Sequence, residues 1–165
     1  MRKLWFEAIK GTQSVELLMP QVFSECPDIW MLIGSSLSVK DLLAMRQTST
    51  HKQKIVEMTL IDQLNTGKII PNALGISTVT SLIDFFGENC SQITQLNLQN
   101  FHDTINSDIK KISEHFGKLK HLFLKGSAIT NASVIHLEKM KLLKSLEISR
   151  CTTLKDFSFL QHIVS

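Results

Sequence analysis

The sequence predicts an α/β fold, in the broad sense that includes α+β, in which one short strand and one helix form a unit that repeats along the chain. Two observations predict it: three segments share the same spacing of aliphatic residues, and helical stripes of apolar residues lie between them. The composition is that of a folded domain, because 43% of the 165 residues are hydrophobic and 20% are charged.

The three similar segments are ITQLNLQNF from Ile93, LKHLFLKGS from Leu119 and LKSLEISRC from Leu143. Each has aliphatic residues at relative positions 1, 4 and 6, and the segments start 26 and then 24 residues apart. Side chains alternate along a strand, so positions 4 and 6 point into a core and positions 3, 5 and 7 point to the opposite face. We therefore expect strands near residues 95–98, 121–124 and 145–148, forming one parallel face with helices on the convex side.

Helical stripes occupy the stretches between these strands. The apolar residues of the first complete unit recur at i, i+4, i+7 and i+11, and a shift of 26 residues towards the N-terminus again finds four apolar positions. The next unit has a shorter stripe. The stripes are Ile105, Ile109, Ile112 and Phe116; Val79, Ile83, Phe86 and Cys90; and Val134, Leu137 and Met140.

A further strand one unit earlier would fall at Ile69 and Ile70, where Pro71 and Gly75 interrupt it. We interpret residues 67–92 as a degenerate capping repeat. The alternative on pattern grounds is an ordinary α/β domain whose strands and helices alternate without a true repeat.

The repeats resemble leucine-rich repeat proteins, in particular the cysteine-containing subclass. LKSLEISRCTTLKD has the LxxLxLxxC core of that subclass, with Cys151 at position 9. The other two segments have Phe101 and Ser127 there, where Asn or Cys is usual. The resemblance implies a leucine-rich repeat solenoid over residues 67–165, whose strand face binds a target protein.

Three short helices are predicted before the repeats, in residues 26–66. Asp28 is placed to cap the first helix, which ends near Gly34. Ser38 and Asp41 have the S-x-x-D spacing of a capping box. The third helix starts at Ser49 or Thr50, its expected apolar face contains Ile55, Met58 and Ile61, and Gly67 is its expected stop.

This helical stretch resembles an F-box, the motif that binds the Skp-type adaptor of cullin–RING (SCF-type) ubiquitin ligases. The resemblance rests on Pro27, Asp28, Ile29, Ile33, Leu37 and the SVKDLL segment from Ser38. It divides the chain into an N-terminal extension (1–25), an F-box-like module (26–66) and leucine-rich repeats (67–165). The residues implied at the adaptor interface are Pro27, Ile29, Ile33, Leu37, Val39 and Leu42.

Other classes of function lack their sequence signals. The net charge of +3 is small and the basic residues form no long run, which disfavours nucleic-acid binding. No stretch has the length of a membrane span, and no secretory signal is evident. The three cysteines and six histidines lack metal-ligand spacing, and no nucleophile or phosphate-loop motif occurs. We expect no cofactor, no metal and no catalytic site.

The expected function is that of a non-catalytic adaptor, a substrate-recruiting F-box subunit that acts in the ubiquitin conjugation pathway. Two alternatives remain: a repeat scaffold whose helices only cap the solenoid, and a ubiquitin ligase that uses Cys90 or Cys151. The resemblance implies a eukaryotic cytoplasm or nucleus, or a host cytoplasm if the chain is a bacterial effector. The expected target-binding residues are Gln95, Asn97, His121, Phe123, Lys125 and Glu147.

Two interpretations of Phe123 stay open at this point. An aromatic side chain on a polar recognition face is typical of a binding hot spot. The other interpretation is that Phe123 packs against the terminal apolar segment formed by Leu4, Trp5 and Phe6.

Overall fold

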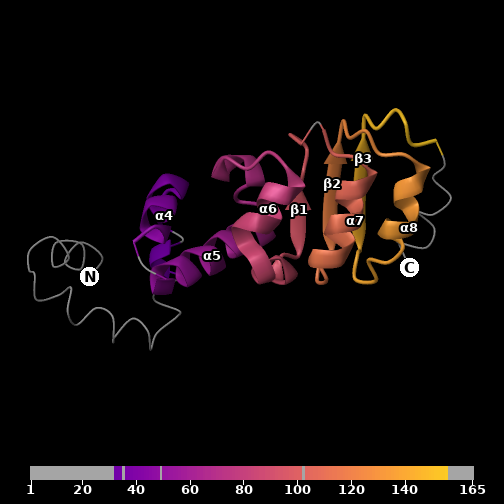
Figure 1. Ribbon diagram of the computed structural model, residues 1–165. Helices are drawn as coiled ribbons and strands as arrows, with labels where there is room; N and C mark the ends of the chain where they lie inside the picture. The colour runs from indigo at the N-terminus through magenta and orange to yellow at the C-terminus, as the bar shows by residue number, and fades with distance from the viewer. Residues whose placement is uncertain (1–31, 35, 49, 102, 156–165) are drawn as a thin grey trace, which may run out of the picture.

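The computed structural model describes residues 32–34, 36–48, 50–101 and 103–155 (Figure 1). Three strands, β1 (Gln95–Asn97), β2 (His121–Lys125) and β3 (Ser145–Ser149), form a parallel sheet in the order β1-β2-β3. Leu96 pairs with Leu122, and Leu122 pairs with Leu146, so equivalent positions of the three sequence repeats lie side by side. The predicted α/β class and the predicted positions of the strands are confirmed.

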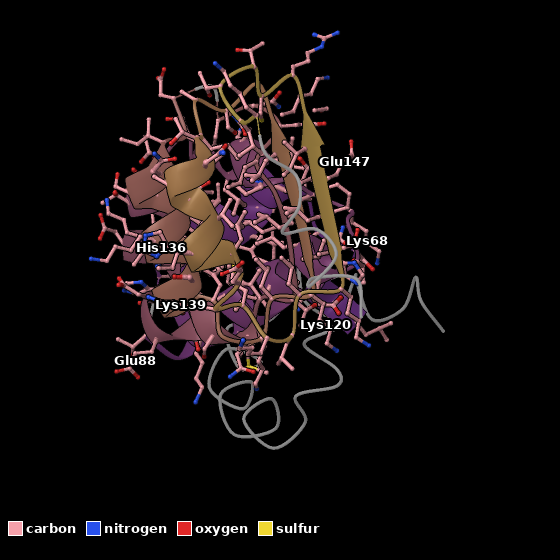
Figure 2. All side chains as sticks on the ribbon, turned by 90° about the vertical axis from the view of Figure 1, so that its right-hand side faces the viewer. Lys68, Glu88, Lys120, His136, Lys139 and Glu147 are labelled. Carbon is pink, nitrogen blue, oxygen red and sulfur yellow. The ribbon has the colours of Figure 1, made fainter. Side chains whose placement is uncertain are left out.

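Helices cover one face of this sheet (Figure 1). In Figure 2, which views the molecule from the side of β3, the helices lie on the left and the strands on the right. A parallel arrangement requires each strand to be followed by a crossover, and the helices supply it. The covering elements are α6 (Val79–Phe86), the 3-10 helix η2 (Gly87–Gln92), α7 (Asn106–His115), the 3-10 helix η3 (Asn131–Ser133) and α8 (Val134–Leu137).

The core lies between the sheet and these helices. Leu96, Leu98, Leu122 and Leu124 are at most 1% exposed, as the alternation predicts. In β3 the equivalent residues are only half-buried.

Ile105 is the exception among the predicted helical stripes. It is 48% exposed, and its place in the buried stripe was predicted wrongly. The reason is that Ile105 is the N-cap of α7, with extended backbone, and its N–H is held by the Asp108 carboxylate at 3.1 Å. The helix starts one residue later than the stripe requires.

Two helices precede the sheet. Helix α4 (Val39–Arg46) starts at Ser38, whose hydroxyl accepts the N–H of Asp41 at 3.2 Å, as the capping spacing predicts. Helix α5 (Thr50–Asn65) ends where Gly67 adopts a positive φ of 70°. The N–H groups of Gly67 and Lys68 then bond back to Leu64 and Gln63, which is the Schellman pattern of helix termination.

The apolar face predicted for α5 needs a correction. Met58 is 45% exposed, whereas Val56, Leu60 and Leu64 are at most 2% exposed. These three residues recur every four positions, so the helix turns a different row toward the core than the prediction assumed. Ile61 is buried as expected.

The predicted degenerate unit between α5 and β1 contains no strand at Ile69 and Ile70, which are half-buried. The chain instead forms the 3-10 helix η1 (Pro71–Leu74), ended by Gly75 at a φ of 74°. Proline at the first position lacks the N–H that a strand ladder needs, which explains why pairing fails here. Among the described residues, Leu32–Gly34 is also helical, while the capping residue Asp28 lies outside them.

Candidate protein-binding surface

The face of the sheet opposite the helices carries the side chains at positions 3, 5 and 7 of each repeat. We call these nine residues the strand face. Lys125 and Glu147 are exposed and the other seven are half-buried. The strand face consists of Gln95, Asn97, Gln99, His121, Phe123, Lys125, Ser145, Glu147 and Ser149.

The register of the sheet fixes how these side chains are grouped. Phe123 is paired with Asn97 on one side and with Glu147 on the other. Neighbouring strands lie about 4.8 Å apart, so the ring is at the centre of a polar surface. All six predicted target-binding residues are brought together on this one face. Phe123 is half-buried.

Backbone hydrogen bonds join the strands by a repeated pattern at their N-terminal ends. The N–H groups of Lys144 and Ser145 both donate to the carbonyl oxygen of Lys120, at 2.8 and 3.0 Å. One unit earlier, Lys120 and His121 both donate to the carbonyl oxygen of Thr94, again at 2.8 and 3.0 Å. Each strand thus starts with two N–H groups on one oxygen of the preceding unit.

No strand precedes β1 among the described residues to supply this oxygen, and the side chain of Asn65 takes its place. Asn65 Oδ1 accepts the N–H groups of Thr94 at 2.6 Å and Gln95 at 3.3 Å. Its amide nitrogen donates to the carbonyl oxygen of Gln92 at 3.1 Å. The last residue of α5 therefore continues the hydrogen-bond pattern of the sheet beyond β1. This role of Asn65 was not predicted.

A largely buried ion pair connects α4 and α5 to the helical elements that precede β1. Arg46, at the end of α4, lies 2.8 Å from the carboxylate of Glu57 on α5. The guanidinium also donates to the carbonyl oxygen of Phe85 at 2.9 Å and stacks over that ring at 4.2 Å. Asn89 donates to the second oxygen of Glu57 at 3.0 Å. Helices α4, α5 and α6 are thereby joined through one polar cluster.

The residues predicted to bind an adaptor differ in exposure. Ile33, Leu37 and Val39 are half-buried. Leu42 is 0% exposed, so its assignment to an adaptor-facing surface is corrected: it is a core residue, because α4 turns it toward α5. Pro27 and Ile29 lie outside the described residues.

Gly34 explains how closely the Leu32–Gly34 turn sits on α5. A Cβ atom at this position would lie 2.6 Å from Thr59 Cγ2, which is closer than side-chain carbons approach. The amide of Gln63 also donates to the Gly34 carbonyl oxygen at 3.5 Å. Only a residue without a Cβ atom fits at this distance. Leu32, in the same short segment, is 61% exposed.

Position 9 of each repeat is structural, as the subclass resemblance implies. Phe101, Ser127 and Cys151 are between 2% and 8% exposed. The asparagine ladder usual at this position is instead formed at the start of the helices. Asn106 accepts the N–H of Thr130 at 2.8 Å, and Asn131 accepts the N–H of Lys155 at 3.2 Å.

The cysteines in the described part of the chain show no activated thiol. Cys90 is 1% exposed, and burial raises the pKa of its thiol to about 11. The thiol is therefore protonated near neutral pH, whereas a nucleophile needs the thiolate. Cys151 is 8% exposed and donates to the carbonyl oxygen of Ser149.

Metal ligands and membrane-crossing helices were also considered for the described residues. No group of three His, Cys, Asp or Glu side chains among them is arranged to hold a metal ion. No helix described for this chain combines the length and the apolar character that crossing a bilayer requires.

Neither a scan against protein-family models nor a search of curated proteins gave a match to this chain.

Proposed function

We propose that this chain is a protein-binding adaptor, the substrate-recruiting subunit of an SCF-type ubiquitin ligase. In this proposal residues 67–165 form a short leucine-rich repeat solenoid that binds a target, and the helices of residues 26–66 bind a Skp-type adaptor. The single observation that carries the binding role is the strand face, which no described helix covers and in which the half-buried ring of Phe123 lies among polar neighbours. Leu4, Trp5 and Phe6, the segment that the alternative interpretation packs against Phe123, lie outside the described residues. Aromatic residues on a polar recognition surface are typical of binding hot spots.

The adaptor-binding half of the proposal is supported by the order of the two predicted modules and by apolar side chains in residues 32–39. Leu32 is 61% exposed, and Ile33, Leu37 and Val39 are half-buried around it. Burying one large aliphatic side chain is worth about 1.5–3 kcal/mol, so three or four of them suffice to anchor an interface.

A second candidate function is a plain repeat scaffold in which the helices serve only as a cap. The hydrogen bonds from Thr94 and Gln95 to Asn65 favour it, because they protect the edge of the sheet without any partner protein. The burial of Leu42 also favours a cap, since it removes one apolar residue from the surface.

Binding of the full chain to a purified Skp-type adaptor distinguishes the two candidates. We expect Ile33→Asp and Leu32→Asp each to weaken adaptor binding by about tenfold or more, because each places a charge in an apolar contact. Calorimetry measures the affinity, and circular dichroism reports whether the variant is folded. Leu32→Asp is expected to leave the fold intact, since this side chain is already exposed, so it tests adaptor binding even if Ile33→Asp unfolds the chain.

Met58→Asp is the matched control, because Met58 is an exposed apolar residue of α5 outside the proposed interface. It is expected to leave adaptor binding unchanged. Absence of adaptor binding by the unmodified chain, with a known F-box protein as positive control, would reject the SCF role. In that case the scaffold function stands if Ile33→Asp also destabilises the sheet.

A further inference from the structure

We propose that the strand face recognises an acidic segment of the target, with carboxylates at the N-terminal ends of β2 and β3 and an apolar side chain on Phe123. This inference rests on the proposed target-binding function and specifies the chemistry of the target. It follows from where the structure places the lysines of the repeats.

Four exposed lysines gather where β2 and β3 begin. Lys120 and Lys144 occupy the same position of consecutive repeats, and the N–H of Lys144 donates to the carbonyl oxygen of Lys120 at 2.8 Å, so the two residues are neighbours. Lys118 and Lys141 lie in the turns that lead into the same two strands. We call Lys118, Lys120, Lys141 and Lys144 the basic edge.

The basic edge has no carboxylate partner among the described residues. The basic residues that form ion pairs in the described part of the chain are Arg46, Lys110 and Lys111, which lie outside the basic edge. Lys118 donates to the neutral side chain of Gln92 at 2.9 Å. Uncompensated like charges repel one another, and an incoming carboxylate relieves that repulsion.

Two further lysines extend the positive charge onto the strand face. Lys68 follows Gly67, which lies directly against the side chain of Gln95 in β1. Figure 2 shows Lys68 and Lys120 on the strand side of the molecule, together with Glu147. Lys125, at the end of β2, is also exposed. Glu147 is the single acidic residue of the strand face as we define it.

The helix side has the opposite balance. Figure 2 places Glu88, His136 and Lys139 there, away from the strands. Its charged residues are Asp84, Glu88, Asp108, Glu114, Glu138, Lys110, Lys111 and Lys139. Acidic side chains are in excess on the helices and basic side chains on the strand side. A small net charge for the whole chain hides this separation.

The distance between the basic edge and Phe123 sets the form of the ligand. Phe123 is three residues beyond Lys120, which corresponds to about 10 Å along a strand. An extended peptide covers that distance with three to four residues. Side chains alternate along an extended peptide, so one of two adjacent carboxylates lies on the same side as an apolar side chain four residues later, and a peptide with two acidic residues before the apolar one matches the surface. Nucleic acid matches it less well, because Glu147 beside the ring repels phosphates and one aromatic residue makes no stacking platform.

The test uses the full chain, labelled with nitrogen-15, and a synthetic peptide with the sequence Glu-Glu-Ser-Ser-Leu. Peptides with Lys-Lys in place of Glu-Glu, or with Ser in place of Leu, are the controls. We expect the first peptide to shift the amide resonances of Lys120, His121, Phe123 and Lys144, and to bind at least about tenfold tighter than the Lys-Lys peptide. Salt at about 0.5 M should weaken binding, because it screens exposed charges.

Charge reversal then locates the site. Lys120→Glu/Lys144→Glu should weaken binding of the acidic peptide by about tenfold or more, while Lys110→Glu/Lys139→Glu on the helix side should leave it unchanged. Lys120→Gln/Lys144→Gln, a milder change, keeps the test valid if the reversal disturbs folding. Phe123→Ala should weaken binding of the Leu peptide and not of the Ser peptide.

The inference is overturned if no resonance moves, if the moving resonances lie on the helices, or if the two charge-reversed variants lose binding equally. Tighter binding of a thymidine oligonucleotide of equal charge would also overturn it, in favour of nucleic acid. Adaptor binding by Leu32 and Ile33 is measured separately, so loss of peptide binding alone rejects the acidic ligand and leaves the adaptor role intact.

Discussion

At β1 the sheet meets helix α5, whereas β3 has β2 as its one strand neighbour in the part of the chain that the structure describes. The consequence is visible in equivalent residues. Leu96 of β1 and Leu98, which follows this strand, are fully buried, while Leu146 and Ile148 of β3 are half-buried. The same sequence pattern therefore gives two degrees of burial, which depend on what lies beside the strand.

Hydrogen bonding shows the same difference. The first strand receives an acceptor from outside the repeat pattern, the side chain of Asn65. In a repeat array each unit is stabilised by its neighbours, so the terminal units need a cap. Helix α5 therefore stabilises the edge of the sheet at β1.

The largest expected effect comes from the leucines at position 4 of the repeat. Leu96→Ala should lower the free energy of unfolding by about 3 kcal/mol, because it removes a fully buried side chain and leaves a cavity. Leu146→Ala should lower it by about half as much, since Leu146 is half-buried. Urea denaturation followed by circular dichroism measures both.

Leu122→Ala is the reference for this pair, because Leu122 is fully buried in the middle strand. Equal losses for Leu96 and Leu146 would mean that both ends of the sheet are covered alike in solution, and the comparison would be wrong.

Much of the architecture could be predicted from the sequence, because the spacing of aliphatic residues directly reflects the strand and helix periods. The three strands and the burial of Ile109 and Ile112 followed from that spacing. The stop at Gly67 followed from the preference of helix ends for glycine. The burial of two other residues, Ile105 and Met58, was predicted wrongly. At a helix boundary one residue decides between cap and core, and a short apolar set fits more than one helical row.

The polar contacts that finish the sheet could not be predicted in the same way. Asn65 meets Thr94 across 29 residues of sequence, and no local pattern indicates that an amide will replace a backbone carbonyl. The hydrogen bonds of Asn106 and Asn131 could have been predicted, because the two asparagines occupy equivalent positions 25 residues apart. From the sequence, only position 9 of the repeat was considered for such hydrogen bonds. The basic edge had the same kind of signal in Lys120 and Lys144.

The second prediction concerns Asn65 itself. Asn65→Leu should lower the free energy of unfolding by about 1–3 kcal/mol, because it leaves the N–H groups of Thr94 and Gln95 without their acceptor at a partly buried site. Asn65→Asp is the matched variant: it keeps an acceptor oxygen and loses only the donor to Gln92. It should cost less than the leucine variant.

Hydrogen exchange tests this locally. The amides of Thr94 and Gln95 should exchange faster in Asn65→Leu, while those of Lys144 and Ser145, which bond to a backbone oxygen, should not change. Unchanged protection at Thr94 would show that the cap is formed by other contacts of α5.

The smallest expected effect contrasts the turns that follow β2 and β3. Gly126 and Arg150 are equivalent residues, and both have a positive φ, of 69° and 58°. A side chain in this conformation costs about 1 kcal/mol, so Gly126→Ala should destabilise the chain by roughly that amount. Arg150→Gly should be neutral or stabilising by less than about 1 kcal/mol, because relief of strain is offset by the greater freedom of glycine in the unfolded chain. Thermal unfolding of the two variants measures the difference, and equal destabilisation would show that the two turns are not equivalent. The two strands thus differ in the backbone as well: the turn after β2 has the glycine that its conformation favours, whereas the turn after β3 holds an arginine at a positive φ.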